Sequence, residues 1–392
     1  MRLHSLEYVE RAGELEEWTL TGLTLGDINL LVGKNASGKT RILNVILHLA
    51  ESISGKLVLS PSGMVVQRQI FNGKSHLFFD NDGQRLEYEL EVIEGKVVRE
   101  VFTVDGDSRL DRGAGGEGWI WAIKEGKKVE FQTPDNQLAV VTRRDSIQHS
   151  YFEPLHQWAS SLYYYAFSTL LGKDKFYVFI KSETEKSDTL NAKDTDQVVD
   201  IYRQGKKAFG ERYAGAVKKD FEAIGYPIDN IDIGVPRSFK IQNSLPGEIT
   251  ALFVKEVDLP GITDQHAMSN GMFRALSIII QINYAVLADT PSCVLIDDIG
   301  EGLDFDRSCG LIDVLISKAQ HSSVQLVMAT NDRFVMNQVP LEAWSILDRQ
   351  ANRVAIRNYL NSKEIFDNFK FTGLNNFDFL AFDYLHAGKR DE

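Results

Sequence analysis

Residues 33–40 read GKNASGKT, and this stretch limits what the chain can fold into more than any other. Its spacing, Gly-x4-Gly-Lys-Thr, is the P-loop pattern. Glycines let the backbone curl so that its N–H groups point at phosphate oxygens, and a following helix adds its positive N-terminal end. INLLV, typical of a strand, precedes the stretch, and helical periodicity follows it over 39–53. We therefore expect a strand–loop–helix unit that binds phosphates; the alternative is an incidental glycine-rich turn.

The loop also indicates which of its side chains would bind. Lys39 would place its charge against the β- and γ-phosphates of a nucleotide, and the Thr40 hydroxyl would ligate Mg²⁺. The predicted nucleotide-binding residues of this segment are Gly33, Lys34, Asn35, Ala36, Ser37, Gly38, Lys39, Thr40 and Arg41.

The bulk composition is that of an ordinary globular protein, with 392 residues, 43% of them hydrophobic and 25% charged. A formal net charge of −12 argues against a general nucleic-acid coat, although a local basic groove stays open. The two cysteines, Cys293 and Cys309, exclude a disulfide framework and a paired-cysteine zinc site, so a cytoplasmic location is expected. The most apolar run, 275–288, contains Gln281 and Asn283 and is shorter than the ~20 residues of a membrane span. It therefore predicts a buried helix, and no membrane partner is expected.

A second informative stretch is SCVLIDDIGEGLDF, residues 292–305, which holds four carboxylates. The apolar strand CVLI delivers Asp297 at its end, as expected of a carboxylate that holds Mg²⁺ beside bound phosphates. The next residue, Asp298, is placed to polarise an attacking water. We assign no chemistry to Glu301. The alternative interpretation is an Asp-Asp turn at a strand end.

A third stretch, QHAMSNGMFRA at 265–275, predicts the start of a long helix about twenty-five residues before the acidic strand. Ser269 is a suitable N-cap, and the exposed N–H groups of the helix would form a second phosphate site. An ordinary capped helix is the alternative. Arg274, one turn into the helix, would reach a phosphate or pair with an acid, and both stay open.

The order of these motifs resembles the ABC-type ATPases, in the soluble branch of Rad50/SMC, RecF and OLD-like proteins. It is most similar to the compact bacterial AAA15/OLD group, many members of which belong to anti-phage or toxin–antitoxin-like systems. The resemblance covers about 25–60 and 265–335. It implies ATP and Mg²⁺ as cofactors, held between two protomers of a homodimer or higher homo-oligomer. Ser269 and Gly271 would then touch the γ-phosphate of the partner's nucleotide, and Asp304 would act across the interface.

Three residues depart from the family pattern. Asp298 stands where the family has a catalytic glutamate, Asn331 stands at the switch histidine, and Met272 stands at the glutamine of the signature. Asparagine can hydrogen-bond a phosphate but cannot carry charge. Lys39, Asp298 and Asn331 remain the candidate catalytic residues, and we expect slow hydrolysis, as in a switch.

These observations predict an α/β fold, a P-loop NTPase of ABC type with a mixed central sheet, an antiparallel β lobe and a helical insertion. We expect a single composite domain over 1–392. Its predicted parts are a nucleotide-binding core at 1–60 and 250–350, the β lobe at 60–148, the helical insertion at 149–245 and a C-terminal tail at 350–392. Within the insertion, 151–171 is expected to be a helix. Tyr163, Tyr164 and Tyr165 are expected to pack in its core, and a surface for a partner protein is the alternative.

Some contacts of the nucleotide stay open. The glutamine that the family uses to sense Mg²⁺ should follow the β lobe, and Gln132, Gln137 and Gln148 are its candidates. The candidates for the adenine contact are Arg2, Arg11 and Trp18.

The resemblance also suggests what the ATPase does. We expect a switch that controls a separate effector, a nuclease or toxin, in anti-phage defence. The alternatives are a DNA-clamping repair ATPase of the RecF/SMC type and a module that binds ATP without hydrolysing it. Basic clusters that would favour DNA binding, or that are only solvated faces, are Arg143 with Arg144, Arg203 with Lys206 and Lys207, and Lys218 with Lys219.

Overall fold

The computed structural model describes residues 1–57, 59, 72–175, 177–179, 194–238, 248–289 and 293–389. The described chain divides into two compact units. The first, called the P-loop unit here, comprises residues 1–162 and 340–392, and the second, called the signature unit, comprises residues 163–339. The strand expected near Phe239 lies outside the described residues.

The P-loop unit is built on a mixed sheet. Its strands follow one another in the order β3–β17–β18–β2–β1–β4–β5–β6–β7–β8–β9. The pairs β3/β17 and β18/β2 are parallel, whereas β17/β18 and β1/β2 are antiparallel. The first five strands are β3 (Ile28–Val32), β17 (Trp344–Gln350), β18 (Arg353–Asn358), β2 (Trp18–Thr24) and β1 (Arg2–Glu10).

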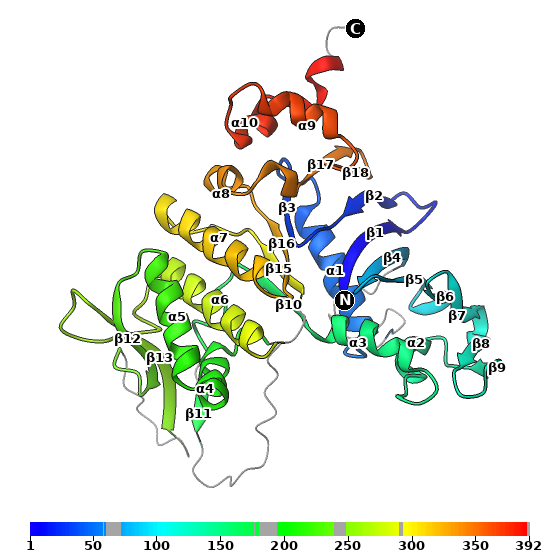
Figure 1. The fold of residues 1–392 in the computed structure, drawn as a ribbon, viewed down its shortest axis with the longest axis horizontal. Coiled ribbons are helices and arrows are strands. Elements are labelled where there is room, and N and C mark those ends of the chain that lie inside the picture. The colour runs from blue at the N-terminus through cyan, green and yellow to red at the C-terminus, as the bar shows by residue number, and fades with distance from the viewer. Residues whose placement is uncertain are drawn as a thin grey trace. The chain divides into compact units, whose positions relative to one another are not determined.

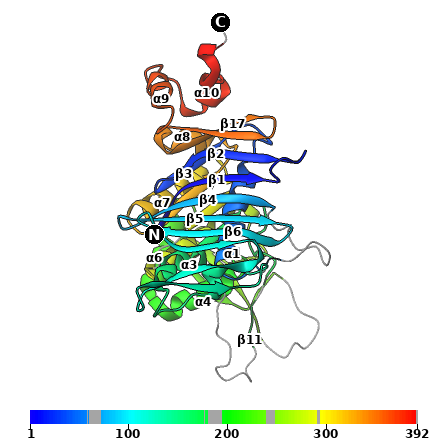
Figure 2. The ribbon, with the colours of Figure 1, turned by 90° about the vertical axis from the view of Figure 1, so that its right-hand side faces the viewer.

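Antiparallel strands continue this sheet into the predicted β lobe, and Figure 2 shows β17, β2, β1, β4, β5 and β6 stacked as a ladder. The lobe consists of β4 (Gly73–Asn81), β5 (Gln84–Ile93), β6 (Lys96–Val104), β7 (Asp107–Gly113), β8 (Glu117–Ala122) and β9 (Lys127–Gln132). Asp82 and Gly83, between β4 and β5, both have positive φ, as a two-residue hairpin turn requires. Over the described residues, the alternating pattern of the sequence predicted this lobe correctly.

The helices of the P-loop unit are α1 (Lys39–Ile53), α2 (Ala139–Thr142), α3 (Glu153–Ser160), α9 (Lys363–Lys370) and α10 (Asn376–Ala381), with short 3-10 turns η1 (Ala114–Gly116), η2 (Ser150–Phe152), η3 (Leu341–Ala343) and η4 (Tyr384–Lys389). Helix α1 packs against α3. The C-terminal segment, expected to be a tail, forms β18, α9 and α10. Its aromatic side chains Phe366, Phe369, Phe379 and Tyr384 pack on one another, with ring centroids 4.9–5.5 Å apart.

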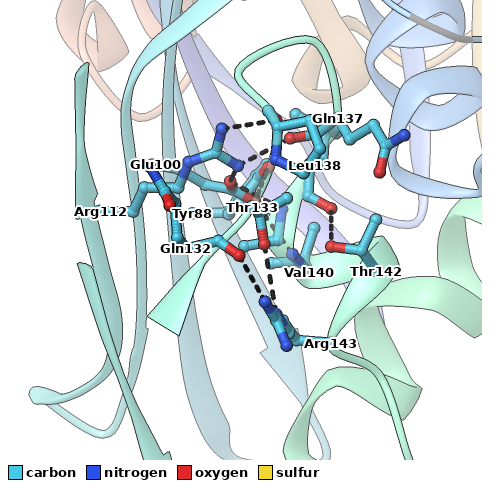
Figure 3. A network of polar contacts seen from close by, with 12 residues as sticks. Tyr88, Glu100, Arg112, Gln132, Thr133, Gln137, Leu138, Val140, Thr142 and Arg143 are labelled. Carbon is cyan, nitrogen blue, oxygen red and sulfur yellow. Dashed lines mark hydrogen bonds and ion pairs between the residues drawn. The ribbon is translucent and has the colours of Figure 1, made fainter. Parts of the chain in front are cut away.

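A buried ion pair braces the connection between β9 and α2 (Figure 3). Arg112 and Glu100 are both fully buried, and the Arg112 Nη1 lies 3.1 Å from the Glu100 carboxylate. Arg112 also donates to the carbonyls of Pro134 and Gln137. The Glu100 carboxylate accepts the N–H groups of Ala139 at 2.8 Å and of residue 140 at 3.0 Å, so it caps the N-terminus of α2. These bonds fasten residues 134–140 to the β lobe.

The signature unit contains the strands β10 (Leu162–Ala166), β15 (Cys293–Asp297) and β16 (Gln325–Ala329), in that order. Strands β15 and β16 are parallel and buried throughout. The helices α6 (Asn270–Leu287), α7 (Phe305–Gln320) and α8 (Arg333–Gln338) belong to the same unit, and Figure 1 shows α6 and α7 lying along β15 and β16. Helix α6 is buried over most of its length, as the apolar run at 275–288 predicted.

A smaller sheet completes the signature unit. Strand β13 (Glu248–Glu256) lies between β11 (Tyr177–Phe179) and β12 (Ile228–Gly234), all antiparallel, and β14 (Thr263–Asp264) also pairs with β13. The helices α4 (Val198–Phe209) and α5 (Glu211–Ala223) pack against α6 and β12. None of the described helices is long and apolar enough to cross a membrane.

The prediction of one helix over 151–171 was wrong in its second half. Helix α3 ends at Ser160, and Tyr163, Tyr164 and Tyr165 belong to strand β10, not to a helix core. Aromatic residues have high strand propensity, and β10 pairs with β15. The Tyr165 hydroxyl donates to Gln281 of α6 at 3.0 Å, so tertiary contacts of this residue support the strand.

Candidate nucleotide-binding site

The P-loop stretch forms the predicted strand–loop–helix unit between β3 and α1. Gly38, the residue before α1, has φ of 113°, and Ala36 has φ of 61°. A left-handed conformation costs an alanine about 1–2 kcal/mol, so this loop holds backbone strain, as functional loops often do. A Cβ at Gly33 would lie 2.6 Å from the Ser37 Oγ and 3.2 Å from the Leu347 Cβ, so the start of the loop leaves little room for a side chain.

Lys39 is the first residue of α1, and its side chain reaches back to the start of this loop. The Lys39 side chain is 7% exposed, and its Nζ donates to the carbonyls of Gly33 at 2.9 Å and Lys34 at 3.3 Å. Gly38 offers no side-chain cap, and the first turn of α1 contains no acidic residue. Uncapped N–H groups at a helix N-terminus beside a buried lysine ammonium are what a polyphosphate requires. Thr40 and Arg41 are exposed at this end of α1.

Trp18 supports the P-loop from below. A Cβ at Gly38 would lie 3.5 Å from the Trp18 ring, and the guanidinium of Arg41 lies 4.4 Å above that ring while it pairs with Glu10 at 2.6 Å. Because Trp18 is only 2% exposed, the indole serves here as packing beneath the loop. The two other candidates for the adenine contact have acidic neighbours: Arg2 pairs with Asp27, and Arg11 lies 4.0 Å from Glu16.

The C-terminal segment approaches the other side of the loop. Arg349, at the end of β17, donates to the carbonyl of Ala36. A cavity of about 490 Å³ is bordered by residues 34–37, the end of β17 and the segment after α10, including His386. The His386 ring lies 3.5 Å from Asp348 and 2.9 Å from Asp383. No sequence motif indicated this arrangement, since it depends on how the C-terminal helices fold back.

The signature unit carries the acidic strand end. Asp297 is 5% exposed, and the Tyr164 hydroxyl of β10 lies 3.5 Å from its carboxylate. The next residue, Asp298, has φ of 54°, a left-handed conformation that is uncommon for residues with a side chain but that aspartate adopts more readily than most. The Asp298 carbonyl accepts the N–H of Glu301 at 3.2 Å, which begins the turn toward α7.

The predicted second phosphate site lies in this same unit. Ser269 caps α6, and its Oγ accepts the Met272 N–H at 3.2 Å. A Cβ at Gly271 would lie within 3.1 Å of the Gly302 carbonyl carbon and of the Leu303 Cδ2. The start of α6 therefore packs directly on the loop between Asp298 and Asp304, which brings two separately predicted motifs together.

Arg274 has a role that the sequence did not indicate. We expected it to reach phosphate or pair with an acid, but its guanidinium donates to three backbone carbonyls instead. These are Thr169 at 2.7 Å, Ser168 at 3.1 Å and Glu301 at 3.2 Å. Arg274 thereby ties α6 to the segment after β10 and to the loop after β15.

The remaining carboxylate and amide candidates lie at helix starts. Asp304 caps α7 by accepting the Arg307 N–H at 3.0 Å, and this bond holds the pKa of Asp304 below its ordinary value. Asn331 is exposed, directly after Thr330, whose hydroxyl donates to the Ile299 carbonyl at 2.9 Å. The loop that carries Asp298 is thus bonded to the end of β16.

None of the three glutamine candidates lies in the signature unit, which carries Asp297. Gln132 belongs to β9, and Gln137 and Gln148 lie between β9 and α3 in the P-loop unit. The segment that does contact Asp297 follows β10, since the Phe167 N–H donates to the Asp297 carbonyl at 2.9 Å. Phe167 is a neighbour of Asp297 that sequence reasoning missed.

Neither the P-loop nor the acidic strand end has a complete set of protein ligands for a metal ion in the part of the chain that the structure describes. Among the described residues, no group of three or more His, Cys, Asp or Glu side chains lies close enough to hold a metal ion. Mg²⁺ commonly binds through one or two protein ligands and the phosphates of a nucleotide, and it keeps several waters. The Thr40 hydroxyl of the P-loop unit and the Asp297 carboxylate of the signature unit are each an oxygen ligand of the kind that Mg²⁺ prefers.

No family model and no curated protein matches the sequence. Among solved structures, the SMC head bound to the C-winged helix domain of ScpA matches with a TM-score of 0.50 and 13% identity, over 91% of this chain and 97% of that chain. The chain has the fold of an SMC head domain. SMC heads from Thermotoga maritima and Pyrococcus furiosus, the latter bound to the C-terminal domain of ScpA, match with TM-scores of 0.44 and 0.49 and identities of 13% and 11%. They cover 91% and 94% of this chain and 99% of their own.

The SMC-head fold confirms the predicted fold class, an α/β P-loop NTPase of ABC type with a large mixed sheet. Within the predicted resemblance, the fold on the Rad50/SMC side is the one that this match shares. At 13% identity the likeness concerns the fold, and the roles of individual residues rest on the geometry described above.

Proposed function

We propose that this protein binds ATP and Mg²⁺ between two copies of itself, hydrolyses the ATP slowly and thereby switches a separate effector protein. The observation that carries the proposal is the P-loop of the first unit, with its strained loop, its uncapped helix start and the buried Lys39 ammonium. Burying a lysine ammonium in a loop without a counter-charge is costly, whereas a bound triphosphate would supply up to four negative charges beside it.

Within one protomer, residues 33–41 would hold the phosphates, with Lys39 at the β- and γ-phosphates. Thr40 and Asp297 would hold Mg²⁺, which screens the charge that develops on the phosphates. Asp298 would orient the attacking water. Its carboxylate is one methylene shorter than a glutamate, and Asn331 supplies no charge, so hydrolysis is expected to be slow.

Across the interface, the partner's Ser269, Gly271 and Asp304 would complete the site. The tight packing of Gly271 on the Gly302 backbone supports this part of the proposal, because it places the exposed N-terminus of α6 and the loop before Asp304 on one rigid platform. Such a platform can close on a nucleotide held by a second copy. ATP then stabilises the dimer, and hydrolysis releases it.

We propose that the effector is a nuclease or toxin in bacterial anti-phage defence. This part of the proposal is supported by the resemblance to the family. An SMC head of this fold is bound to a winged helix domain in one solved structure, so the fold can carry a partner protein. Purification from the native host with ATP, beside the Lys39→Ala variant, would identify the effector. A partner enriched only with the wild-type chain and ATP supports the switch, and equal recovery with Lys39→Ala contradicts it.

The enzymatic part has a direct test. Wild-type protein should bind ATP, Lys39→Ala should lose that binding, and Lys127→Ala should bind normally because this exposed side chain of β9 pairs with Glu125. Turnover should be slow and should fall further in Asp298→Asn. Turnover of several per second that survives Asp298→Asn would refute the slow switch.

A DNA-clamping ATPase is the second candidate, and the SMC-head fold favours it. The predicted basic clusters give it less support, because several of these cations have acidic partners within 4 Å. The pairs are Arg144–Glu153, Arg203–Asp200, Lys206–Asp232 and Lys218–Glu222. A salt-dependent affinity for DNA, lost on charge reversal at 206 and 207, would establish this function.

A further inference from the structure

The segment after β10 brings a lysine to the N-terminus of α6. The Lys173 Nζ donates to the Asn270 Oδ1 at 2.8 Å, and Asn270 is the first residue of that helix. Asn270 and the capping Ser269 are exposed, and Lys173 is half-buried. The ammonium therefore stands beside the exposed helix start that is proposed to meet the partner's nucleotide.

The position is electrostatically unfavourable for a cation in the unliganded chain. The N-terminus of an 18-residue helix carries a partial positive charge, which repels an ammonium group. Burial lowers the pKa of Lys173 from its ordinary value of 10.5, and the charge of Arg274 adds to the effect. Within the described part of the chain, Lys173 bonds to the neutral Asn270 amide and forms no ion pair with a carboxylate. An anion at this place would relieve all these costs at once.

The backbone beneath Lys173 is fixed. Buried Gln265 donates to the carbonyls of Lys173 at 3.0 Å and Lys175 at 2.8 Å, and accepts the Leu252 N–H at 2.9 Å. On the N-terminal side, Arg274 binds the carbonyls of 168 and 169. The segment is thus anchored to β13 and α6 on both sides of Lys173, so a change of rotamer alone can move the ammonium from Asn270 to a ligand.

We propose that Lys173 is a ligand of the terminal phosphate of the nucleotide bound by the partner protomer. It acts beside Ser269: its ammonium exchanges the Asn270 amide for a phosphate oxygen when two copies close on ATP. This places a full positive charge next to the γ-phosphate in a chain whose Asn331 supplies none. No bond is made or broken by Lys173; it stabilises the closed dimer and the charge on the transferring phosphoryl group. The inference rests on the proposed function.

The test uses full-length chains carrying Asp298→Asn, so that ATP is held and not hydrolysed. Lys173→Gln should weaken ATP-dependent dimerisation by about 10-fold or more, the effect of losing a charge-assisted hydrogen bond. It should leave ATP binding by the monomer unchanged, because the role is in trans. Lys175→Gln is the matched control: Lys175 lies two residues further on and pairs with Asp196 at 2.7 Å, so its loss should not affect dimerisation. Lys173→Arg should retain dimerisation.

Complementation separates the trans role from a structural one. In chains with Asp298 intact, Lys39→Ala and Lys173→Gln should each turn over poorly. A mixture forms heterodimers in which the P-loop of the second chain meets the Lys173 of the first, so turnover should rise above that of either variant alone. Lack of recovery, normal dimerisation of Lys173→Gln, or weaker ATP binding by its monomer would each overturn the inference. Failure of the wild-type chain to dimerise with ATP would instead overturn the proposed function.

Discussion

Replacing Gly271 by alanine tests whether the start of α6 must lie against the loop after β15. The added Cβ would lie 3.1 Å from the Gly302 carbonyl carbon and 3.1 Å from the Leu303 Cδ2. The Gly302 carbonyl oxygen would be nearer still, and carbon atoms pack at about 3.5–4.0 Å, so the two backbones would have to separate by at least about 0.4 Å. The Gly302 atoms belong to the backbone, which cannot turn aside as the Leu303 side chain can.

Gly271→Ala should change the stability of the protein and the activity of the proposed site by different amounts. Overpacking of this kind costs about 1–3 kcal/mol of unfolding free energy, part of which the better helix propensity of alanine returns. Displacement of Ser269 by a similar distance should affect the proposed composite site far more, since a misplacement near 1 Å can cost about 100-fold in rate. We therefore expect a moderate loss of stability and a large loss of ATP-dependent dimerisation and turnover.

The assays are denaturant unfolding, sedimentation with and without ATP, and steady-state phosphate release. Gly215→Ala is the matched control, because Gly215 lies inside α5 with no atom within 4 Å of the added Cβ. That change should stabilise the protein by about 0.5–1 kcal/mol and leave dimerisation unchanged. If Gly271→Ala dimerised with ATP as readily as Gly215→Ala, the contact between α6 and the loop would have no part in closing the site.

Three further predictions concern stability. Arg112→Met leaves the buried Glu100 carboxylate without its cation, so the free energy of unfolding should fall by about 3–5 kcal/mol. Arg99→Met removes a more exposed ion pair on the same two strands and should cost less than about 1 kcal/mol. Equal losses of unfolding free energy in the two variants would contradict the role of burial. Ala36→Gly should raise stability by up to about 1 kcal/mol in thermal unfolding, because glycine adopts the positive φ without strain; a clear loss would refute strain in the loop. Lys173 has a folded-state pKa below the unfolded 10.5, so its charge opposes folding at neutral pH. The stability of wild type relative to Lys173→Gln should rise as pH increases through the folded pKa toward 10.5, and a pH-independent difference would refute it.

Local patterns in the sequence were sufficient for the elements that contain them. The P-loop needs only eight consecutive residues, and its strand and helix follow from periodicity on either side. The buried strand that ends at Asp297, the helix that begins at Asn270 and the antiparallel lobe were predicted for the same reason. Each is specified by residues close together in the chain, where propensity, capping and alternation can be read directly.

The sequence failed where distant segments decide the outcome. Tyr163–Tyr165 was predicted as part of a helix, yet pairing with β15 makes it a strand. Arg274 finds carbonyls more than 100 residues away, at Ser168 and Thr169, and a local pattern has no means of showing them.

What the sequence determined by itself is a chain with a P-loop pattern, an acidic strand end and a second, capped helix start, which together predict nucleotide binding. Only the tertiary structure decided which residues contact these motifs. Gly271 packs against Gly302, and Lys173 lies beside Asn270, 97 residues further along the chain. The physical reason is that hydrogen-bond and packing energies depend on distances in space. The number of residues between two positions does not determine their distance in space, which depends on how the intervening residues fold.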